Sequence, residues 1–496
     1  MSFILAIDQG TTSTRAFLFD ANAVPIAHHE IALSQIYPAN GWVEHDAEEI
    51  WAAVCVCCRE VAKNIATKDI VAIGITNQRE TTVLWDRNTG LPLHNAIVWQ
   101  DRRTAERCRE LMAAGHEKTV AETSGLLLDP YFSATKMQWL LDHIPNARER
   151  AEKNELALGT IDSFLIYKLT GGKVHATDVT NASRTSLLNL TSLVWDETLL
   201  QLFNIPRALL PQVRDSADDY GVTTIDFLGT PIFIRGVAGD QQAALFGQAC
   251  FAPGDVKTTY GTGCFMLVNT GNTASASHNR LLTTCAYRPV GNTAYAIEGS
   301  IFIAGAVVQW LRDALGIIHN ANEIEALVSS AKPTEGLYFV PAFTGLGAPY
   351  WDPDARAAIL GLTRDTGAAE IAQAALDAVC LQTRDLLEAM ALDMSAAGLV
   401  RPTTLKVDGG MVRNNSFCQR LADITGLPVE RPRVTETTAL GAAFLAGLSS
   451  GLFSDLTQVA NTWSLERRFD PQISAQIRDA LYDGWRKAVA RIRANV

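Results

Sequence analysis

A hydroxyl-rich turn near the start of the chain has the residue types of a phosphate-binding site. The turn follows the apolar stretch FILAID at 3–8 and contains Gly10, Thr11, Thr12 and Ser13. Glycine lets the backbone approach a ligand closely, and the hydroxyl and amide groups of such a turn can donate hydrogen bonds to phosphate oxygens. The sequence therefore predicts phosphate binding at this turn, with an ordinary structural turn as the alternative.

A second turn, YGTG at 260–263, repeats the Gly-Thr chemistry of the first. Asp8 lies just before the first turn, whereas the second turn has no aspartate. A carboxylate beside a phosphate repels it unless a cation lies between the two. The asymmetry predicts that the two turns bind one polyphosphate from opposite sides, and that Asp8 helps to hold a magnesium ion on one side only.

Asp240, in the segment GVAGDQQAAL, is the candidate catalytic group. It lies where an apolar strand meets a helix, which is a position where α/β proteins often display catalytic side chains. Aspartate is also a common helix N-cap, and the pattern alone does not separate the two roles.

A third glycine site follows in KVDGGMVRNN at 406–415. A strand that ends in Gly409-Gly410, with Asn414 opening a helix, offers bare backbone and an amide side chain to a nucleobase and a ribose. The strand-Gly-Gly-helix pattern is common in proteins. Its place after the second phosphate turn favours nucleotide binding.

A polar and aromatic set in the first half could bind a small polyol. Arg79 and Glu80 are adjacent charges between two predicted strands, and Trp99 and Tyr131 are aromatic residues with polar edges. Hydroxyl groups need paired donors and acceptors, and a carbon chain needs a flat apolar face. The alternatives are a solvated turn for Arg79 and Glu80 and core packing for Trp99.

The elements that must position these residues have a mixed order in the first half. Strands are predicted at 3–8, 15–20 and 25–33, followed by a helix with Asp46 as N-cap and Glu49 completing a capping box. Two further strands are predicted at 70–76 and 81–86. Tight turns join antiparallel neighbours and helical crossovers join parallel ones, so the sheet is expected to be mixed.

The second half repeats this outline. The predicted elements are a strand at 231–240, a helix at 241–249, a strand-turn-strand at 255–270, a strand at 293–299, a helix at about 302–315, a long helix at about 368–394, a strand at 404–410 and helices from about 414 and 437. The repetition and the chain length predict two domains, 1–245 and 246–496, facing each other across a central cleft.

Composition excludes several classes of protein. Hydrophobic residues make up 48% of the 496 residues, and the net charge of −11 comes without any block of Lys and Arg, which disfavours nucleic-acid and anionic-membrane partners. No apolar run is long enough for a bilayer, and the N-terminus lacks a basic leader, so a cytoplasmic protein without integral membrane contact is expected. The nine cysteines show no disulfide or zinc spacing.

The motifs resemble, in the same order and over almost the whole chain, those of the FGGY carbohydrate kinases. The matching segments are AIDQGTTSTR, GITNQRETT, DPYFSATK, TNASRT, GDQQAALFGQ, YGTGCFM and VDGGMVRNN. Within the family, NQRETT and GWVEHD are similar to the branch that phosphorylates glycerol. The resemblance implies an α/β fold of two actin-like, ribonuclease-H-like ATPase domains with mixed sheets flanking a central cleft.

The resemblance also implies an activity and a set of site residues. ATP would transfer its γ-phosphoryl group to glycerol, giving sn-glycerol 3-phosphate, with Asp240 as general base and Mg²⁺ as cofactor. The positions that match glycerol-binding residues are Arg79, Glu80, Trp99, Tyr131, Asp240, Gln241 and Phe265. The positions that match nucleotide-binding residues are Thr11, Thr12, Ser13, Arg15, Thr262, Gly305, Gln309, Gly410 and Asn414. Asp8 and Asp240 are the expected metal ligands, and a homodimer or homotetramer is the expected assembly.

Two other functions remain open from the sequence. One is a kinase of the same family for another polyol or a ketose, which would keep Asp8 and Asp240 but differ around the acceptor residues. The other is a nucleotide-driven switch on the same fold, resembling actin or a chaperone, with no small acceptor.

Overall fold

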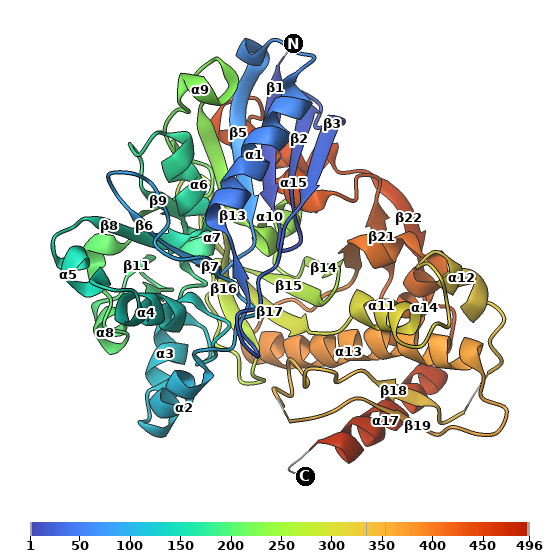
Figure 1. Cartoon of the computed structure of the whole chain (residues 1–496). Helices are drawn as coiled ribbons and strands as arrows, with labels where there is room; N and C mark the ends of the chain where they lie inside the picture. Colours follow the sequence, from blue (N-terminus) through green and yellow to red (C-terminus); the bar gives the residue numbers. More distant parts are fainter. Residues whose placement is uncertain (1, 334, 353, 494–496) are drawn as a thin grey trace.

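The first mixed sheet begins at the N-terminus of the computed structural model, which describes residues 2–333, 335–352 and 354–493. The strand order is β13-β5-β1-β2-β3 (Figure 1). The strands are β1 (Phe3–Gln9), β2 (Ser13–Asp20), β3 (Pro25–Ala32), β5 (Ile70–Asn77) and β13 (Ile234–Gly239). β1 pairs antiparallel with β2 and parallel with β5, so the predicted mixed sheet is confirmed.

Helices α1 (Ala47–Ala62) and α15 (Thr437–Ser449) pack against this sheet. Successive side chains of a strand point to opposite faces, so the apolar strand β1 is buried on both. Leu5 belongs to the core cluster that includes Ile50 of α1, whereas Ile4 belongs to the cluster that includes Leu440 of α15. A segment from the end of the chain thus completes the core of the first sheet.

Helix α1 begins as predicted, but its cap differs from the prediction. Asp46 is the N-cap, and its carboxylate accepts a hydrogen bond from the amide of Glu48. The carboxylate of Glu49 accepts instead from Ser34, through both the backbone amide and the hydroxyl. The reciprocal capping box expected between Asp46 and Glu49 is therefore wrong, because the preceding loop competes for the glutamate.

A second, seven-stranded mixed sheet belongs to the second half of the chain, in the order β16-β17-β15-β14-β20-β21-β22. The strands are β14 (Val256–Tyr260), β15 (Cys264–Gly271), β16 (Leu282–Tyr287), β17 (Ala294–Ile301), β20 (Leu405–Asp408), β21 (Val429–Pro432) and β22 (Leu465–Phe469). The long helix α13 (Ala368–Ala396) packs against β17 and β15. In Figure 1 it crosses the lower part of the molecule.

Helices α10 (Asp240–Gly247) and α15 cross at very short range. A Cβ atom on Gly441 of α15 would lie 1.8 Å from the carbonyl oxygen of Ala243 in α10. A Cβ atom on Gly247 would lie 2.1 Å from the carbonyl oxygen of Thr437. Glycine at both positions lets the two backbones touch, which fixes the helix that begins at Asp240 against the first sheet.

The predicted strand at 81–86 forms, but in a different sheet from β5. It is β6 (Thr82–Asp86), in a four-stranded sheet of order β4-β7-β6-β8 with β4 (Glu44–His45), β7 (Ala96–Ile97) and β8 (Leu156–Thr160). Three two-stranded sheets are formed by β9 (Ala176–Asp178) with β12 (Gln212–Arg214), β10 (Leu188–Asn189) with β11 (Val194–Trp195), and β18 (Tyr338–Val340) with β19 (Ala358–Leu360).

The other helices connect these strands. In the first half they are α2 (Ala105–Ala113), α3 (Glu117–Ser124), α4 (Ser133–His143), α5 (Ala147–Glu152), α6 (Ile161–Leu169), α7 (Val179–Ala182), α8 (Glu197–Leu202) and α9 (Ile225–Leu228). In the second half they are α11 (Gly305–Asp313), α12 (Glu323–Val328), α14 (Asn415–Thr425), α16 (Leu456–Thr462) and α17 (Ala475–Ile492). Short 3₁₀ turns lie at Thr67–Asp69, Arg207–Leu209 and Gly410–Arg413. Among the helices of the described residues, none combines the length and the apolar composition that spanning a bilayer requires.

Helix α11 starts three residues later than the predicted 302. Its first residue is Gly305, whose amide donates to the carbonyl of Gly261 at 2.9 Å, so the segment before it is held in a non-helical turn. The division into domains at 245/246 stays a prediction: α10 contacts strands of both sheets, and α15, from the second half of the chain, packs against the first sheet.

Candidate active site

Arg79 and Glu80 lie in the turn between β5 and β6, and both side chains are buried. Glu80 adopts a positive φ of 60°, which a non-glycine residue rarely does, and such conformations gather at functional sites. The alternative of a solvated turn is therefore wrong for this pair.

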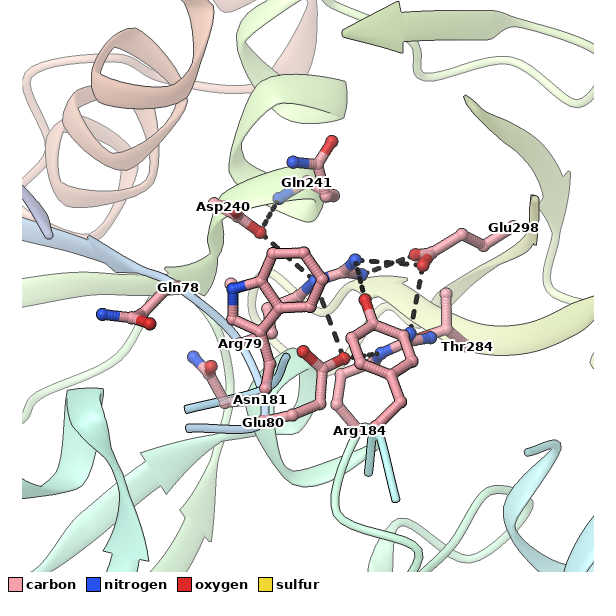
Figure 2. A network of polar contacts seen from close by, with 12 residues as sticks. Gln78, Arg79, Glu80, Asn181, Arg184, Asp240, Gln241, Thr284 and Glu298 are labelled. Atoms are coloured by element: carbon pink, nitrogen blue, oxygen red, sulfur yellow. Dashed lines mark hydrogen bonds and ion pairs between the residues drawn. The ribbon is translucent and has the colours of Figure 1, made fainter. Parts of the chain in front are cut away.

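The guanidinium of Arg79 is the centre of a buried polar network (Figure 2). It donates two hydrogen bonds to the carboxylate of Glu298 in β17, at 2.5 and 3.0 Å. It also donates to the hydroxyl of Tyr131 and to the side-chain oxygen of Gln242, each at 3.3 Å. Its Nε lies 3.2 Å from Oδ1 of Asp240. Arg79 thus links the predicted glycerol-binding residue Tyr131, the candidate base Asp240 and the second sheet.

Arg184 closes the network from the other side. Its Nε donates to Oε1 of Glu80 at 2.7 Å, and its Nη2 donates to Oε1 of Glu298 at 3.0 Å. Its guanidinium carbon lies 5.3 Å from the ring centre of Phe132, within range of a cation–π contact. Glu80, Arg184, Glu298 and Arg79 therefore form a closed ring of alternating charges, as Figure 2 shows.

The charges of this ring are balanced locally by neighbours of opposite sign. Burial raises the pKa of Glu80, and the charges of Arg79 and Arg184 oppose that shift without cancelling it. Burial acts in the same direction on Glu298, but there the two arginines outweigh it, and its pKa is below the ordinary value. Both guanidinium groups donate hydrogen bonds to Glu298, whereas only that of Arg184 does so to Glu80, which explains the difference.

Aromatic rings lie beside the network. Trp99 contacts Tyr131 and Phe265 edge-on, with ring centres 5.6 and 6.1 Å apart. The guanidinium carbon of Arg79 lies 5.8 Å from the ring centre of Phe265. Trp99 keeps part of its surface exposed, so simple core packing does not describe it. The three rings and the arginine together offer flat apolar faces next to polar groups, the combination expected for a polyol site.

Asp240 is the first residue of α10, and Gly239 rather than Asp240 is the N-cap. Its Oδ1 accepts a hydrogen bond from the amide of Gln241 at 2.7 Å and faces Nε of Arg79. Its other oxygen, Oδ2, has no hydrogen-bond partner within the described part of the chain, and 30% of the side chain is exposed. One oxygen is thus held in place while the other is free to meet a ligand.

Gln241, the other predicted acceptor residue of α10, is oriented by Lys257 of β14. The ammonium of Lys257 donates to Oε1 of Gln241 at 2.6 Å and to the hydroxyl of Thr259 at 2.8 Å. Burial lowers the pKa of Lys257, although the nearby carboxylates of Asp408 and Asp240 oppose this. The buried ammonium places a positive charge near the candidate base.

Asp8, the predicted metal ligand, forms an ion pair with Arg15. The guanidinium of Arg15 donates to Oδ2 of Asp8 at 2.5 Å and to Glu436, the N-cap of α15, at 2.9 Å. Burial raises the pKa of Asp8; Arg15 opposes that shift, and the charges of Asp240 and Glu436 add to it. Asp8 and Asp240 therefore lie close enough to repel each other.

This pair of carboxylates fits a magnesium ion that keeps most of its water. Two neighbouring carboxylates with no other ligand are typical of Mg²⁺ sites completed by water and phosphate oxygens. Within residues 2–333, 335–352 and 354–493, no group of three or more His, Cys, Asp or Glu side chains could hold a metal ion. Asp8 and Asp240 would thus supply only part of the coordination shell.

The two predicted phosphate turns both form. In the first, the amide of Gly10 donates to the carbonyl of Ser13 at 2.9 Å, Thr12 is exposed, and the hydroxyl of Thr11 accepts from the indole nitrogen of Trp99 at 2.8 Å. In the second, Thr262 is exposed, and its carbonyl accepts from the amide of Ala304. The first turn therefore directly contacts Trp99, one of the three aromatic rings beside the network.

Four of the predicted nucleotide-binding residues lie on α11 and around the start of α14. Gly305 and the exposed Gln309 lie on α11, and a Cβ atom on Gly305 would meet the carbonyl oxygen of Gly261 at 2.6 Å. Gly410 is exposed with open space where a Cβ would project. Asn414 is the N-cap of α14, and its buried Nδ2 has no hydrogen-bond partner among the described residues. An unused donor beside bare backbone suits a nucleoside.

Comparison with known proteins agrees with this arrangement. Residues 3–247 match the N-terminal domain of the FGGY family of carbohydrate kinases, and residues 256–450 match its C-terminal domain. The glycerol kinase of Alcanivorax borkumensis is 60% identical over 494 residues, covering 99% of this chain and 98% of that protein. The chain belongs to the FGGY family of carbohydrate kinases. Glycerol kinase 1 of Pseudomonas aeruginosa is 58% identical, with 99% of each chain covered.

Solved structures of two kinases have the same fold. Glycerol kinase of Plasmodium falciparum with ADP superposes with a TM-score of 0.92 at 36% identity, covering 100% of this chain and 99% of that one. Gluconate kinase of Lactobacillus acidophilus reaches 0.90 at 22% identity, covering 100% and 99%, and supports the fold alone. The predicted actin-like ATPase fold with mixed sheets is confirmed.

Several residues of the site were not predicted as site residues, among them Arg184, Glu298 and Lys257. Arg184 lies within TNASRT, a segment quoted only for its family resemblance. Glu298 is the one charged residue of the otherwise uncharged strand AYAIEGSI, and Lys257 is the one charged residue of VKTTY. An isolated charge in a strand that pairs on both sides was the available signal, because a buried charge needs a partner.

Proposed function

We propose that this FGGY kinase transfers the γ-phosphoryl group of ATP to glycerol and forms sn-glycerol 3-phosphate. The observation that carries the proposal is the buried set of paired donors and acceptors beside Asp240, with Arg79 and Glu80 at its centre and aromatic rings along one side. Full-length relatives that are 60 and 58% identical are named glycerol kinase, which supports the choice of acceptor.

In the proposed mechanism, Arg79 and Glu80 bind hydroxyl groups of glycerol as donor and acceptor. Tyr131, Trp99 and Phe265 enclose its carbon chain. Asp240 accepts the proton of the terminal hydroxyl through its unpartnered Oδ2, while Arg79 and the amide of Gln241 hold Oδ1 in place. The oxygen then attacks the γ-phosphorus, and the chemistry depends mainly on positioning and charge stabilisation.

The nucleotide would lie between the two turns. Thr11, Thr12, Ser13 and Thr262 donate to phosphate oxygens, and Gly305, Gln309, Gly410 and Asn414 surround the adenosine. When bound with ATP, a magnesium ion neutralises charge on the phosphate oxygens, and Asp8 and Asp240 would hold it. Arg15 keeps Asp8 oriented through their ion pair and adds positive charge near the phosphates.

We further propose that residues 1–245 and 246–496 act as two domains that close on the substrates, since excluding water prevents its competition with glycerol. A homodimer or homotetramer acting in the cytoplasm is part of the same proposal. Size-exclusion chromatography with light scattering tests the assembly. X-ray scattering with and without substrates tests the closure.

The experiment that tests the function is ADP release by the purified protein with Mg-ATP. Glycerol is compared with xylulose, ribulose, erythritol and no acceptor, and the product is identified by mass. Glycerol-dependent ADP with glycerol 3-phosphate as product supports the proposal. Preference for a ketose or a tetritol moves the protein to another branch of the family. ADP release that does not depend on any acceptor supports an ATPase switch instead.

A further inference from the structure

The segment Thr180–Arg184 contacts the proposed glycerol-binding residue Glu80, the strand that leads to Asp240 and the second sheet. We propose that Arg184 is a positioning residue for the acceptor site, holding Glu80 directly and Arg79 through Glu298. The inference rests on the proposed function, because Arg79 and Glu80 are taken to bind the acceptor.

Arg184 is placed to fix both acceptor residues at once. Its side chain is fully buried, and two different nitrogens of its guanidinium contact Glu80 and Glu298 at 2.7 and 3.0 Å. Glu298 in turn receives two hydrogen bonds from Arg79. A planar guanidinium with fixed donor directions orients carboxylates more strictly than an ammonium does, so lysine cannot reproduce both contacts.

Glu80 is held more closely by Arg184 than by Arg79. The nearest nitrogen of Arg79 lies 3.9 Å from Oε1 of Glu80, beyond hydrogen-bond distance, whereas that of Arg184 lies at 2.7 Å. A buried carboxylate without a hydrogen-bonded cation tends to take up a proton and then presents a donor in place of an acceptor. Arg184 therefore keeps Glu80 in the form and direction that can accept from a hydroxyl group.

The rest of the segment anchors Arg184 to the site. The hydroxyl of Thr180 accepts from the amide of Gly239, the residue before Asp240, at 2.9 Å. Asn181 exchanges two side-chain hydrogen bonds with Asn77, at 2.9 and 3.1 Å, just ahead of the Arg79 turn. The hydroxyl oxygen of Ser183 lies 3.0 Å from the hydroxyl oxygen of Thr284 in β16.

These contacts make one short segment the common support of three parts of the site. Figure 2 shows Asn181, Arg184 and Thr284 around Arg79 and Glu80. A change at Arg184 therefore alters how the acceptor is held. None of these bonds reaches the two predicted nucleotide turns, so we expect the turns to keep their geometry. Glycerol binding and ATP binding are expected to respond differently.

Arg103 provides a matched control. Its side chain is also fully buried and bridges two carboxylates, Glu44 at 2.7 Å and Asp101 at 2.9 Å. As in Arg184, its buried Nη1 has no hydrogen-bond partner among the described residues. Neither of its carboxylate partners is a proposed site residue. Loss of Arg103 thus reproduces the structural damage of removing a buried bridging arginine without touching the acceptor residues.

The test compares Arg184→Gln, Arg184→Lys and Arg103→Gln with the unchanged protein. The measurements are the melting temperature, kcat and the separate KM values for glycerol and ATP. We expect Arg184→Gln to raise the glycerol KM on the order of 10- to 100-fold, the factor that a hydrogen bond to a charged group supplies. The ATP KM should stay within about twofold. Arg103→Gln should lower the melting temperature and leave both KM values within about twofold.

A double-mutant cycle with Glu80→Gln shows whether Arg184 acts through Glu80. Once Glu80 no longer carries a charge, adding Arg184→Gln should raise the glycerol KM much less than it does in the unchanged protein. Equal effects in both backgrounds overturn the inference. So does an unchanged glycerol KM in folded Arg184→Gln; if that variant does not fold, Arg184→Lys decides in the same way.

Failure of the inference is distinct from failure of the proposed function. An unchanged protein that releases ADP without any dependence on glycerol overturns the proposed function, and the inference with it. An unchanged protein with glycerol-dependent activity, combined with Arg184 variants that lose only melting temperature, overturns the inference alone.

Discussion

The indole nitrogen of Trp99 donates a hydrogen bond to the hydroxyl of Thr11 at 2.8 Å. Trp99 is one of the aromatic residues of the proposed glycerol site, and Thr11 lies in the first predicted phosphate turn. The two proposed binding sites are therefore joined by one direct contact. We therefore expect the position of the Trp99 ring and that of the first turn to depend on each other through this bond.

Replacing Trp99 by phenylalanine keeps an aromatic ring and removes this hydrogen bond. We expect the ATP KM to rise about fivefold, because a neutral hydrogen bond contributes on the order of 1 kcal/mol. The glycerol KM should change less, since the ring stays in contact with Tyr131 and Phe265. Steady-state kinetics with each substrate varied in turn measures both values. A rise confined to glycerol would contradict the link.

Asp240→Asn removes the proposed general base while keeping the size of the side chain. Turnover at saturating glycerol and ATP should fall by about 10²- to 10⁴-fold, the usual contribution of general-base catalysis. The melting temperature should hardly change, because Asp240 is partly exposed and its Oδ2 has no partner in the described part of the chain. Near-normal turnover in the folded variant would remove Asp240 from this role.

Gly441→Ala tests the close crossing of α10 and α15. The new methyl group would meet the carbonyl oxygen of Ala243 at 1.8 Å, and backbone atoms cannot move aside as a flexible side chain can. We expect the free energy of unfolding to fall by about 1–3 kcal/mol or more, as for overpacked cores. Urea denaturation followed by circular dichroism measures it. Stability equal to that of the unchanged protein would show that the crossing can relax.

Gly410→Ala is the same substitution at a position with open space around the new methyl group. The free energy of unfolding should change by less than about 0.5 kcal/mol. If adenosine lies against this backbone, the methyl group projects toward it, and the ATP KM should rise on the order of tenfold. The KM for glycerol serves as the internal control. Unchanged kinetics would place the adenosine elsewhere.

His45 should make the protein less stable in acid. Burial lowers the pKa of His45 to about 4, with the charge of Glu49 opposing that shift only weakly. In the unfolded chain, His45 takes up a proton near pH 6.5, whereas in the folded chain it does so only near pH 4. The free energy of unfolding therefore decreases as the pH falls through this range. His45→Gln should remove about 3 kcal/mol of that loss.

The check on this prediction is the free energy of unfolding, measured by urea denaturation at intervals from about pH 8 to about pH 4. The difference between the two proteins should change across that range and level off above about pH 7. His175, whose pKa burial lowers to about 3, stays in both proteins and contributes equally to both curves. A constant difference would mean that His45 takes up its proton at its usual pH.

The sequence was sufficient for the elements that depend on local patterns. Strands β1 and β2 and the hydroxyl-rich turn between them follow from apolar runs broken by glycine and threonine, and the start of α14 follows from Asn414 as a cap. The two turns and the position of the Arg79–Glu80 pair between two strands were located in the same way, and their binding roles stay predictions.

Long-range pairings were not accessible from these patterns. Glu298 contacts Arg79 across 219 positions of sequence, and Arg15 contacts Glu436 across 421. No periodicity encodes which buried charge meets which partner. The same limit explains why the competition of Ser34 for Glu49 was missed, since a capping box is a local rule that a neighbouring loop overrides here.

Helix α15 has a consequence for how the protein is made. It comes from residues 437–449, yet it covers one face of a sheet whose strands end by residue 239. On the ribosome, that face stays uncovered until the chain beyond Ser449 has emerged. Nascent chains with apolar surface exposed for so long depend on holding factors or low concentration to avoid aggregation. A chain that ends after residue 245 would therefore expose this apolar face and tend to aggregate. The order of synthesis thus differs from the order in which the core is completed.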